Sequence, residues 1–368
     1  MLPQKIAIIS AVIYPRNSPR AHRATELAKE LSRQGHNVTL YGVLGEYDYS
    51  EFESENNLKV KSIGNPLFYP INSDGDSKRS FTLKVSEKIL KPFIQFPDIE
   101  LLYWVRNTIL KENEFDILIT SAIPHSIHWG AAWAKETYKE RFPKVWIADC
   151  GDPFMGNEFQ KPLFYFKYFE KWFCKKADFI TIPVDEAKNA YYKEFRSKLV
   201  TIPQGFKFDN RQKDNNPSKN KVPTFLYAGA FYQGKRDPGK FFQYLAQLDI
   251  DFKFIIYSKN VQSFESYLKP LGDKVEIRSY IPRIELLGVM SKMDFLINFE
   301  NSSTYQVPSK LIDYFIVGRP VLSVPNEAIN KKTISEFLKG NYDSQLTLEG
   351  IEKYDIVNVA KKFMQLGL

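Results

Sequence analysis

Apolar and polar residues follow two alternating patterns along this chain. Short apolar runs of strand length, such as residues 5–14 (KIAIISAVIY) and 37–43 (NVTLYGV), predict buried strands. Between them, residues 19–34 carry an apolar residue every three or four positions, which predicts an amphipathic helix with one face on the core. Ser18 and Pro19 are the residue types that cap and open such a helix. Strand, helix and strand in this order predict the start of a doubly wound parallel sheet.

The same alternation continues and falls into two halves. Residues 177–195 (ADFITIPVDEAKNAYYKEF) predict the strand and then the helix that close the first half. Residues 209–221 (DNRQKDNNPSKNK) are polar and indicate a linker or an exposed loop. Strands and helices then alternate again, with one helix predicted at 261–271. The chain therefore repeats one kind of architecture twice.

Length and composition are consistent with two domains. A chain of 368 residues favours two domains over one, and a hydrophobic content of 43% suffices for a core in each. We expect an α/β protein with two Rossmann-like doubly wound domains, residues 1–204 and 205–350, and a terminal helix at 351–368. Two cysteines give no disulfide framework and fit the reducing cytoplasm. We expect the N-terminal apolar run to be a short strand rather than a signal peptide, and no apolar run is long enough to predict a membrane span.

The formal net charge of +8 favours an anionic partner. Nucleotide sugars, anionic lipids and nucleic acids all qualify, but the basic residues are dispersed and no nucleic-acid recognition motif is present. Residues 82–96 predict an amphipathic helix that places Lys84, Lys88 and Lys91 beside an apolar stripe. Such a helix suits contact with an anionic membrane, and an ordinary surface helix explains the same pattern. No group of His, Cys and carboxylate residues has metal-ligand spacing.

Residues 294–324 form the stretch with the clearest chemistry. They predict a buried strand, a polar loop, a helix and a further strand, with Gly318 ending the helix. The free N–H groups of Ser309 and Lys310 and the helix dipole create an anion site at the helix start. Asp313, one turn on, can accept hydrogen bonds from a sugar diol, so phosphate and diol together suggest a nucleotide. The alternative is an ordinary helix with a surface Lys–Asp pair.

Polar residues also follow the predicted strands of the first half. His125 comes after one strand, and Asp149 and Asp152 come at and after the end of the next. Ligands of a parallel sheet bind at the carboxyl ends of its strands, so these side chains are candidates for a site. Arg20 and Arg23 crowd the start of the first helix, where cations oppose the dipole unless an anion binds. The alternative is that these arginines point into solvent.

Residues 294–324 resemble the donor-binding segment of the retaining glycosyltransferases of family 4, which have the GT-B fold. The motif of that family is Glu, seven residues, Glu, then a small-residue helix and Gly-x-Pro-Val. Asp313 falls on the second Glu, which in the family binds the donor ribose. Tyr305 replaces the first Glu, which contacts the donor sugar, so the resemblance implies that sugar recognition differs here or uses Gln306 or Glu300 instead.

The start of the second half resembles the same family. Gly229 ends a predicted strand where the family has Gly-Arg followed by a Lys, and Lys235 matches that Lys. Ala230 replaces the Arg, and Arg236 stands close enough in sequence to supply the charge. Both cations would neutralise a diphosphate leaving group. The loop at Ile281 lies where the family holds the nucleotide base.

Residues 92–156 resemble one branch of the family. Asp149 and Asp152 match the two Asp of its Asp-x-Arg-Asp-Pro-Trp pattern, whereas Gly151 replaces the Arg. Cys150 stands where the wider family often has a His that contacts the donor sugar. Asp149, Asp152 or His125 are the candidates to replace that His.

The resemblance implies retaining transfer of a sugar from a UDP-, GDP- or dTDP-sugar to a saccharide or lipid-linked acceptor in polysaccharide or glycolipid biosynthesis. The donor would bind the second domain and the acceptor the first, with the terminal helix crossing back to the first domain. No cofactor or metal is implied, and the enzyme would work in the cytoplasm, in solution or peripherally on the membrane. Two alternatives share the fold: a nucleotide-sugar epimerase and a non-catalytic nucleotide-binding member.

These expectations assign roles to individual residues. The implied catalytic residues are Lys235, Arg236, Asp152 and His125. The implied donor-binding residues are Asp313, Ser309, Lys310, Gly229, Tyr305, Gln306 and Ile281. Arg20, Arg23 and Asp149 are expected on the acceptor or phosphate side.

Overall fold

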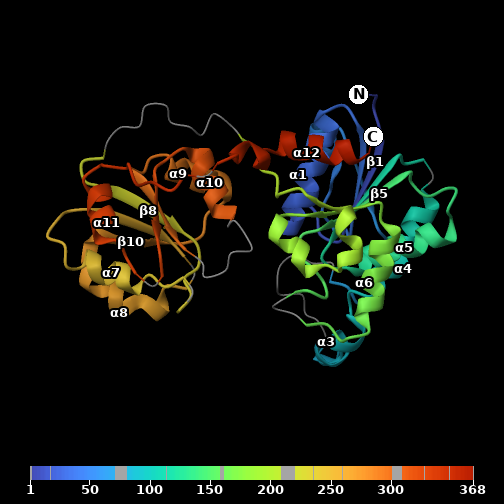
Figure 1. Cartoon of the computed structure of the whole chain (residues 1–368), viewed down its shortest axis with the longest axis horizontal. Helices are drawn as coiled ribbons and strands as arrows, with labels where there is room; N and C mark the ends of the chain where they lie inside the picture. Colours follow the sequence, from blue (N-terminus) through green and yellow to red (C-terminus); the bar gives the residue numbers. More distant parts are fainter. Residues whose placement is uncertain are drawn as a thin grey trace. The chain divides into compact units, whose positions relative to one another are not determined.

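The computed structural model describes residues 2–16, 18–70, 81–112, 114–157, 161–208, 220–234, 236–258, 260–300, 309–326, 328–347 and 349–367. The chain folds into two compact units (Figure 1). The first unit comprises Met1–Lys207 together with Glu352–Leu368, and the second comprises Phe208–Ile351. Each unit is built around its own parallel sheet, as the alternating pattern of the sequence predicts.

The sheet of the first unit has seven strands in the order β3-β2-β1-β4-β5-β6-β7. Every adjacent pair is parallel. The strands are β1 (Lys5–Ser10), β2 (Asn37–Gly42), β3 (Lys59–Ser62), β4 (Ile117–Ala122), β5 (Val145–Cys150), β6 (Phe179–Ile182) and β7 (Leu199–Thr201). The helices are α1 (Pro19–Arg33), α2 (Ser50–Asn56), α3 (Phe81–Ile94), α4 (Glu100–Lys111), α5 (Ser126–Thr137), α6 (Phe166–Lys176) and α12 (Ile356–Leu366).

Both faces of this sheet are covered by helices. Successive side chains of a strand point to opposite faces. On β1, Ile6 and Ile8 pack into a cluster with residues of α1, α2 and α12, whereas Ala7 and Ile9 pack into a cluster with residues of α4, α5 and α6. The continuous apolar run of β1 is therefore explained by burial on both sides.

The first helix begins and ends as its sequence predicts. The Ser18 side chain accepts a hydrogen bond from the backbone N–H of Ala21 at 3.2 Å, and Pro19 occupies the first turn. Gly35 takes a positive φ of 90°, which costs glycine little. Local capping chemistry therefore sets the bounds of α1.

The C-terminal segment completes the first unit. Its backbone pairs with the end of the segment Met1–Lys207. The N–H of Phe206 donates to the carbonyl of Tyr354 at 2.8 Å, and the N–H of Ile356 donates to the carbonyl of Phe206 at 2.9 Å. Helix α12 then lies along α1 (Figure 1), with Val359 and Phe363 in the same buried cluster as Leu27.

The second unit has a five-stranded parallel sheet in the order β10-β9-β8-β11-β12. Its strands are β8 (Thr224–Ala228), β9 (Lys253–Tyr257), β10 (Val275–Arg278), β11 (Phe295–Phe299) and β12 (Val321–Val324). Its helices are α7 (Gly239–Leu245), α8 (Glu265–Leu268), α9 (Arg283–Met290), α10 (Ser309–Val317) and α11 (Lys331–Leu338). One face packs on α7, α8 and α11, and the other packs on α9 and α10. Gly318 ends α10 with a φ of 74°, as predicted.

One predicted helix is wrong in kind, and a second is divided into shorter pieces. Residues 185–195 form 3₁₀ turns, η1 (Asp185–Ala190) and η2 (Lys193–Lys198), and residues 261–271 are divided among η4 (Gln262–Phe264), α8 and η5 (Lys269–Lys274). The turn η1 buries no residue, so no apolar face stabilises a regular helix there. Among the helices of the described ranges, none is long and apolar enough to cross a bilayer.

Candidate functional sites

In the second unit, the side chain of Lys310 at the start of α10 lies over an aromatic ring. Its Nζ is 4.6 Å from the centre of the ring of Tyr227, which is the second-to-last residue of β8. Within the described part of the chain, this ammonium has no hydrogen-bond partner. Burial and the neighbouring charge of Arg236 lower the pKa of Lys310 to about 7. Such a cation is unfavourable by itself and would be stabilised by an anion.

Arg236 is held beside Tyr227 by both its backbone and its side chain. Its backbone pairs with Tyr232, through N···O distances of 2.9 and 3.0 Å. Its guanidinium donates to the carbonyl of Ala230 at 3.3 Å and also hydrogen bonds to the Tyr227 side chain. The Tyr227 hydroxyl in turn donates to Ala230 O at 2.9 Å. Two cations therefore converge on one tyrosine at the carboxyl end of β8.

Gly229 shapes the backbone beside these cations. Its φ is 147°, and a Cβ built on it would come within 3.0 Å of the Tyr227 hydroxyl. Its N–H donates to the carbonyl of Tyr257 on β9 at 2.9 Å. A side chain at this position would therefore disturb both the turn and the tyrosine that anchors Arg236.

Asp313 lies one turn after Lys310 and forms an ion pair with α9. The Arg283 guanidinium donates to Asp313 Oδ1 through Nε at 2.9 Å and through a terminal nitrogen at 2.5 Å. The carboxylate remains 16% exposed. Ile281, in the loop before α9, packs against the apolar cluster that contains Leu311. Lys235, Tyr305, Gln306 and the Ser309 side chain lie outside the described residues.

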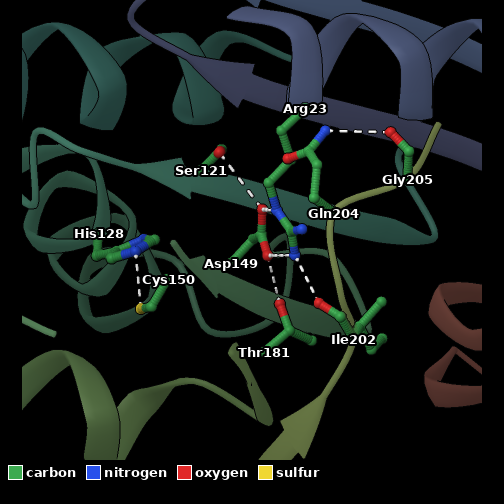
Figure 2. A network of polar contacts seen from close by, with 9 residues as sticks. All are labelled: Arg23, Ser121, His128, Asp149, Cys150, Thr181, Ile202, Gln204 and Gly205. Atoms are coloured by element: carbon green, nitrogen blue, oxygen red, sulfur yellow. Dashed lines mark hydrogen bonds and ion pairs between the residues drawn. The ribbon is translucent and has the colours of Figure 1, made fainter. Parts of the chain in front are cut away.

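In the first unit, Arg23 and Asp149 form a buried ion pair (Figure 2). The Arg23 guanidinium donates to both carboxylate oxygens of Asp149, at 2.7 and 2.6 Å, and to the carbonyl of Ile202 at 3.1 Å. The Thr181 hydroxyl donates to Asp149 at 2.6 Å. Arg23 is 8% exposed and Asp149 is 1% exposed. The pair therefore belongs to the interior, and a ligand at the surface would meet Arg20 instead.

A second buried network lies beside this pair. The indole N–H of Trp146 donates to the Thr120 hydroxyl at 2.8 Å, and that hydroxyl lies 2.8 Å from His128 Nδ1. In our assignment the Thr120 hydroxyl donates to Nδ1, so Nε2 carries the proton of the neutral ring and donates to Cys150 Sγ at 3.4 Å (Figure 2). Burial lowers the pKa of His128 well below its usual value. His128 is thus a neutral core residue with both ring nitrogens in contact.

A groove of about 860 Å³ is lined by residues that follow the carboxyl ends of β4 and β5, including the start of α5. His125, Ser126 and Trp129 contribute to its lining, together with prolines from the neighbouring loops. Its cations are Arg20, Lys84, Lys88, Lys91 and Lys161, and its acids are Glu87 and Asp98. The groove is therefore concave, partly apolar and predominantly cationic.

His125 lies in this groove and is 5% exposed. The backbone of Asp152 hydrogen bonds to its ring, while its Nε2 has no partner among the described residues. The bonded nitrogen is therefore Nδ1, and we assign the proton of the neutral ring to it, so that Nε2 can accept a hydrogen bond. Burial lowers the pKa of His125 to about 3. Arg20 lies 3.9 Å from the Asp152 carboxylate, and both are partly exposed.

Sequence reasoning missed several of these groups. It selected Lys310 for its backbone N–H, whereas the side chain is the unusual group, and it did not select Tyr227, Ser126 or Trp129. Only Ser126, which follows His125 directly at a helix start, carried a local signal. Within the described ranges, no three His, Cys, Asp or Glu side chains gather as a metal site.

Comparison with known proteins identifies the family. The model of the family described as Glycosyltransferase Family 4 matches residues 21–209, which is just over half of the chain. The chain belongs to glycosyltransferase family 4. No curated protein sequence matches this glycosyltransferase significantly.

Solved structures show the fold of this glycosyltransferase. A glycosyltransferase from Rickettsia africae ESF-5 is similar with a TM-score of 0.64 and 13% identity, over 100% of this chain and 98% of that one. The catalytic domain of starch synthase IV from Arabidopsis thaliana, bound to ADP and acarbose, has a TM-score of 0.61 and 10% identity, over 99% of each chain. HepE from Anabaena, bound to UDP and glucose, has a TM-score of 0.58 and 10% identity, over 98% of each. The two parallel sheets are thus those of the GT-B fold.

Proposed function

We propose that this family 4 glycosyltransferase transfers a sugar from a nucleotide-sugar donor, bound by the second unit, to an acceptor hydroxyl, with retention of configuration. The observation that carries the proposal is the buried, unpartnered ammonium of Lys310 beside Arg236, within the described residues. A nucleoside diphosphate would supply the missing negative charge. The structural neighbours that hold UDP with glucose, or ADP with acarbose, support a donor of this class.

The donor is assigned to residues around the start of α10 and the end of β8. Lys310, Arg236 and Lys235 would hold the diphosphate, together with the backbone N–H of Ser309. Asp313 would accept hydrogen bonds from the ribose. The remaining proposed contacts are Gly229 at the phosphate, Ile281 at the base, and Tyr305 and Gln306 at the sugar.

The acceptor is assigned to the groove of the first unit. Its lining offers His125 and Arg20, and Asp152 lies 3.9 Å from Arg20. Arg23 and Asp149 would act from inside, by fixing α1 and β5 below the groove. The free, buried cysteines of this unit fit an enzyme of the cytoplasm.

The chemistry follows from the charges. As the bond between sugar and diphosphate breaks, negative charge grows on the leaving phosphate, and Lys310, Arg236 and Lys235 would stabilise it. A histidine with a pKa of about 3 is too weak a base to take the acceptor proton at neutral pH. The departing phosphate would therefore take that proton, while His125 orients the acceptor hydroxyl. This proposal needs no metal ion to neutralise the leaving group.

The proposal is tested by thermal-shift titration with UDP-, GDP- and dTDP-sugars. One of the three should stabilise the wild type, by about 2.7 kcal/mol at a hundredfold excess over Kd. Lys310→Met should abolish this shift, because it removes the buried ammonium and keeps most of the volume. Lys332→Met is the matched control, since Lys332 is 86% exposed in the same unit. A shift that Lys310→Met leaves intact would contradict the donor site.

Turnover then separates the reaction classes. Loss of donor that depends on an added acceptor supports a transferase. Epimerisation of the donor without acceptor would replace the proposed reaction, and nucleotide binding without any turnover would indicate a binding protein.

A further inference from the structure

Helix α6 carries a buried carboxyl group that the proposed reaction does not use. Glu170 is 0% exposed and lies on the buried face of this helix. Its Oε1 accepts a hydrogen bond from the backbone N–H of Met155 at 3.2 Å, and the backbone of Phe154 also hydrogen bonds to the carboxyl group. Its Oε2 has no hydrogen-bond partner among the described residues. The carboxyl group therefore holds the backbone of a segment outside its own helix.

That segment, residues 151–157, is the loop after β5, and it shapes the groove of the first unit. Three of its residues line the groove. The centre of the Phe154 ring lies 4.8 Å from the centre of the His125 ring, and the backbone of Asp152 hydrogen bonds to the same histidine. The position of this loop therefore helps to fix His125, which orients the acceptor hydroxyl in the proposed function.

Among the described residues, no cation pairs with Glu170. The ionisable side chains that interact with it or lie on the helix packed beside α6 (Figure 1) are all uncharged at neutral pH. Burial raises the pKa of the cysteines and tyrosines in this group and lowers the pKa of its histidines. They are Cys150 on β5, Cys174 on α6, Tyr191 and Tyr192 after η1, and His125 and His128 at the start of α5. The charged groups of the adjoining segments pair with each other, Lys171 with Glu194 and Arg20 with Asp152.

Burial without a cation raises the pKa of Glu170 from 4.5 to about 7. The ionised carboxylate accepts the two backbone hydrogen bonds more strongly, because charge-assisted hydrogen bonds are the stronger kind. The protonated carboxyl group costs less to bury. A glutamine would accept the same hydrogen bonds without a charge, so a glutamate adds a proton that is gained and lost near neutral pH.

We infer that Glu170 is a positioning residue of the groove, whose carboxyl group holds the 151–157 loop more firmly when it loses its proton. At lower pH the loop is held less firmly, and His125 with it. This role goes beyond the proposed function, because the effect on the loop needs neither nucleotide nor acceptor. An effect on acceptor binding would rest on that function.

Hydrogen exchange of the loop amides tests this role. Protection factors, which are corrected for the intrinsic pH dependence of exchange, are compared at about pH 6 and about pH 8. In the wild type, the amides of Phe154 and Met155 should gain several-fold protection at the higher pH. Glu170→Gln should keep the loop in place and remove this dependence. Glu194→Gln, which changes an exposed carboxylate of the same unit, is the matched control and should behave as the wild type.

Glu170 should also affect stability, with a definite sign. Its pKa is 4.5 in the unfolded chain and about 7 in the folded one, so the folded state binds this proton more tightly. The resulting stabilisation is full below pH 4.5 and is lost as the pH rises to about 7. In urea unfolding, the wild type should therefore lose stability relative to Glu170→Gln over this window.

The role is overturned if the loop amides of the wild type show no dependence on pH, or if Glu170→Gln keeps that dependence. If Glu170→Gln does not fold, NMR of the wild type with carbon-13-labelled glutamate decides the question. One glutamate must then titrate near pH 7 together with the exchange of the loop, and a protein without such a glutamate refutes the role.

The donor site provides an independent readout. A nucleotide sugar should stabilise wild type and Glu170→Gln equally, because it binds the second unit. Failure of every nucleotide sugar to stabilise the wild type would contradict the proposed function and leave the behaviour of the loop unchanged, so the two failures can be told apart.

Discussion

At the scale of single residues, this protein keeps its most unusual charges in two different situations. The Arg23–Asp149 pair is buried and each member satisfies the other. Lys310 is buried beside a second cation, and its ammonium has no hydrogen-bond partner among the described residues. A buried ion pair is typical of a structural element, whereas a buried cation next to a second cation is typical of a ligand-binding site.

The charge of Lys310 should make stability depend on pH. Its pKa falls from 10.5 to about 7 on folding, so above pH 7 the unfolded state binds more protons at this residue than the folded state. Stability therefore rises with pH through this residue, by up to about 1.4 kcal/mol per pH unit. We expect urea unfolding of wild type to show this gain between pH 7 and 8.5 relative to Lys310→Met. Equal pH profiles for the two proteins would mean that the ammonium is solvated.

The Arg23–Asp149 pair should matter for stability. Asp149→Asn keeps the shape but leaves Arg23 as an uncompensated buried charge, which costs about 3–5 kcal/mol. Chemical unfolding followed by tryptophan fluorescence measures the loss. Asp152→Asn, which changes a partly exposed carboxylate, should cost far less. If Asp149→Asn is as stable as wild type, the pair is not a structural element, and a role at the acceptor regains support.

Asp313 should contribute to nucleotide affinity. A hydrogen bond to a charged group contributes about 1.5–3 kcal/mol, so Asp313→Ala should weaken nucleotide binding roughly 10- to 100-fold. Asp313→Asn retains an acceptor oxygen and should lose less. Calorimetric titration with the nucleotide measures both. Unchanged affinity in Asp313→Ala would assign this carboxylate to its ion pair with Arg283 alone.

At the scale of elements, the last helix belongs to the first unit although it ends the chain. Helix α12 buries Val359, Phe363 and Met364 in the cluster that also covers α1 and one face of the sheet. Within the described part of residues 352–368, nothing else buries this apolar face. The helix is therefore stabilised by its contact with α1 and the sheet.

Truncation of this face should therefore destabilise the first unit. Phe363 is 1% exposed, and Phe363→Ala should cost about 3–5 kcal/mol. Lys361→Ala on the exposed side of the same helix is the control. Tryptophan fluorescence during urea unfolding reports the first unit. A loss no greater than that of the control would show that α12 is dispensable for this core.

At the scale of the whole molecule, each unit has its own sheet and its own pair of apolar clusters. Domains with separate cores often unfold as separate units. The glycosyltransferase is thus expected to respond to its two substrates through different parts of the chain.

Calorimetry should resolve two unfolding transitions. Tryptophan fluorescence should follow only that of the first unit, which holds all the tryptophans. A nucleotide that binds the second unit should raise the midpoint temperature of the transition of that unit, since ligands stabilise the unit that binds them. One transition that shifts as a whole would indicate that the units unfold cooperatively.

The sequence by itself determined most of the strands and helices, both ends of α1, the end of α10 at Gly318, and the division into two α/β halves. These features depend on residues close together in the chain: Ser18 caps an N–H three residues away, and Gly318 ends its own helix. The motif around Asp313 is local in the same way. The structure of short segments such as 185–195 was not predicted correctly, because their neighbours in the fold decide whether they bury an apolar face.

Only the tertiary structure decided which candidates meet. Arg23 and Asp149 are 126 residues apart, and the register of the sheet rather than any local pattern joins them. The same is true of Lys310 and Tyr227, and of the groove lined by α3, α5 and the loop before α6. The sequence could select polar residues at strand ends, but burial and pairing depend on residues distant in the chain. Those contacts separate the structural pair Arg23–Asp149 from the groups that lack a partner within the described residues.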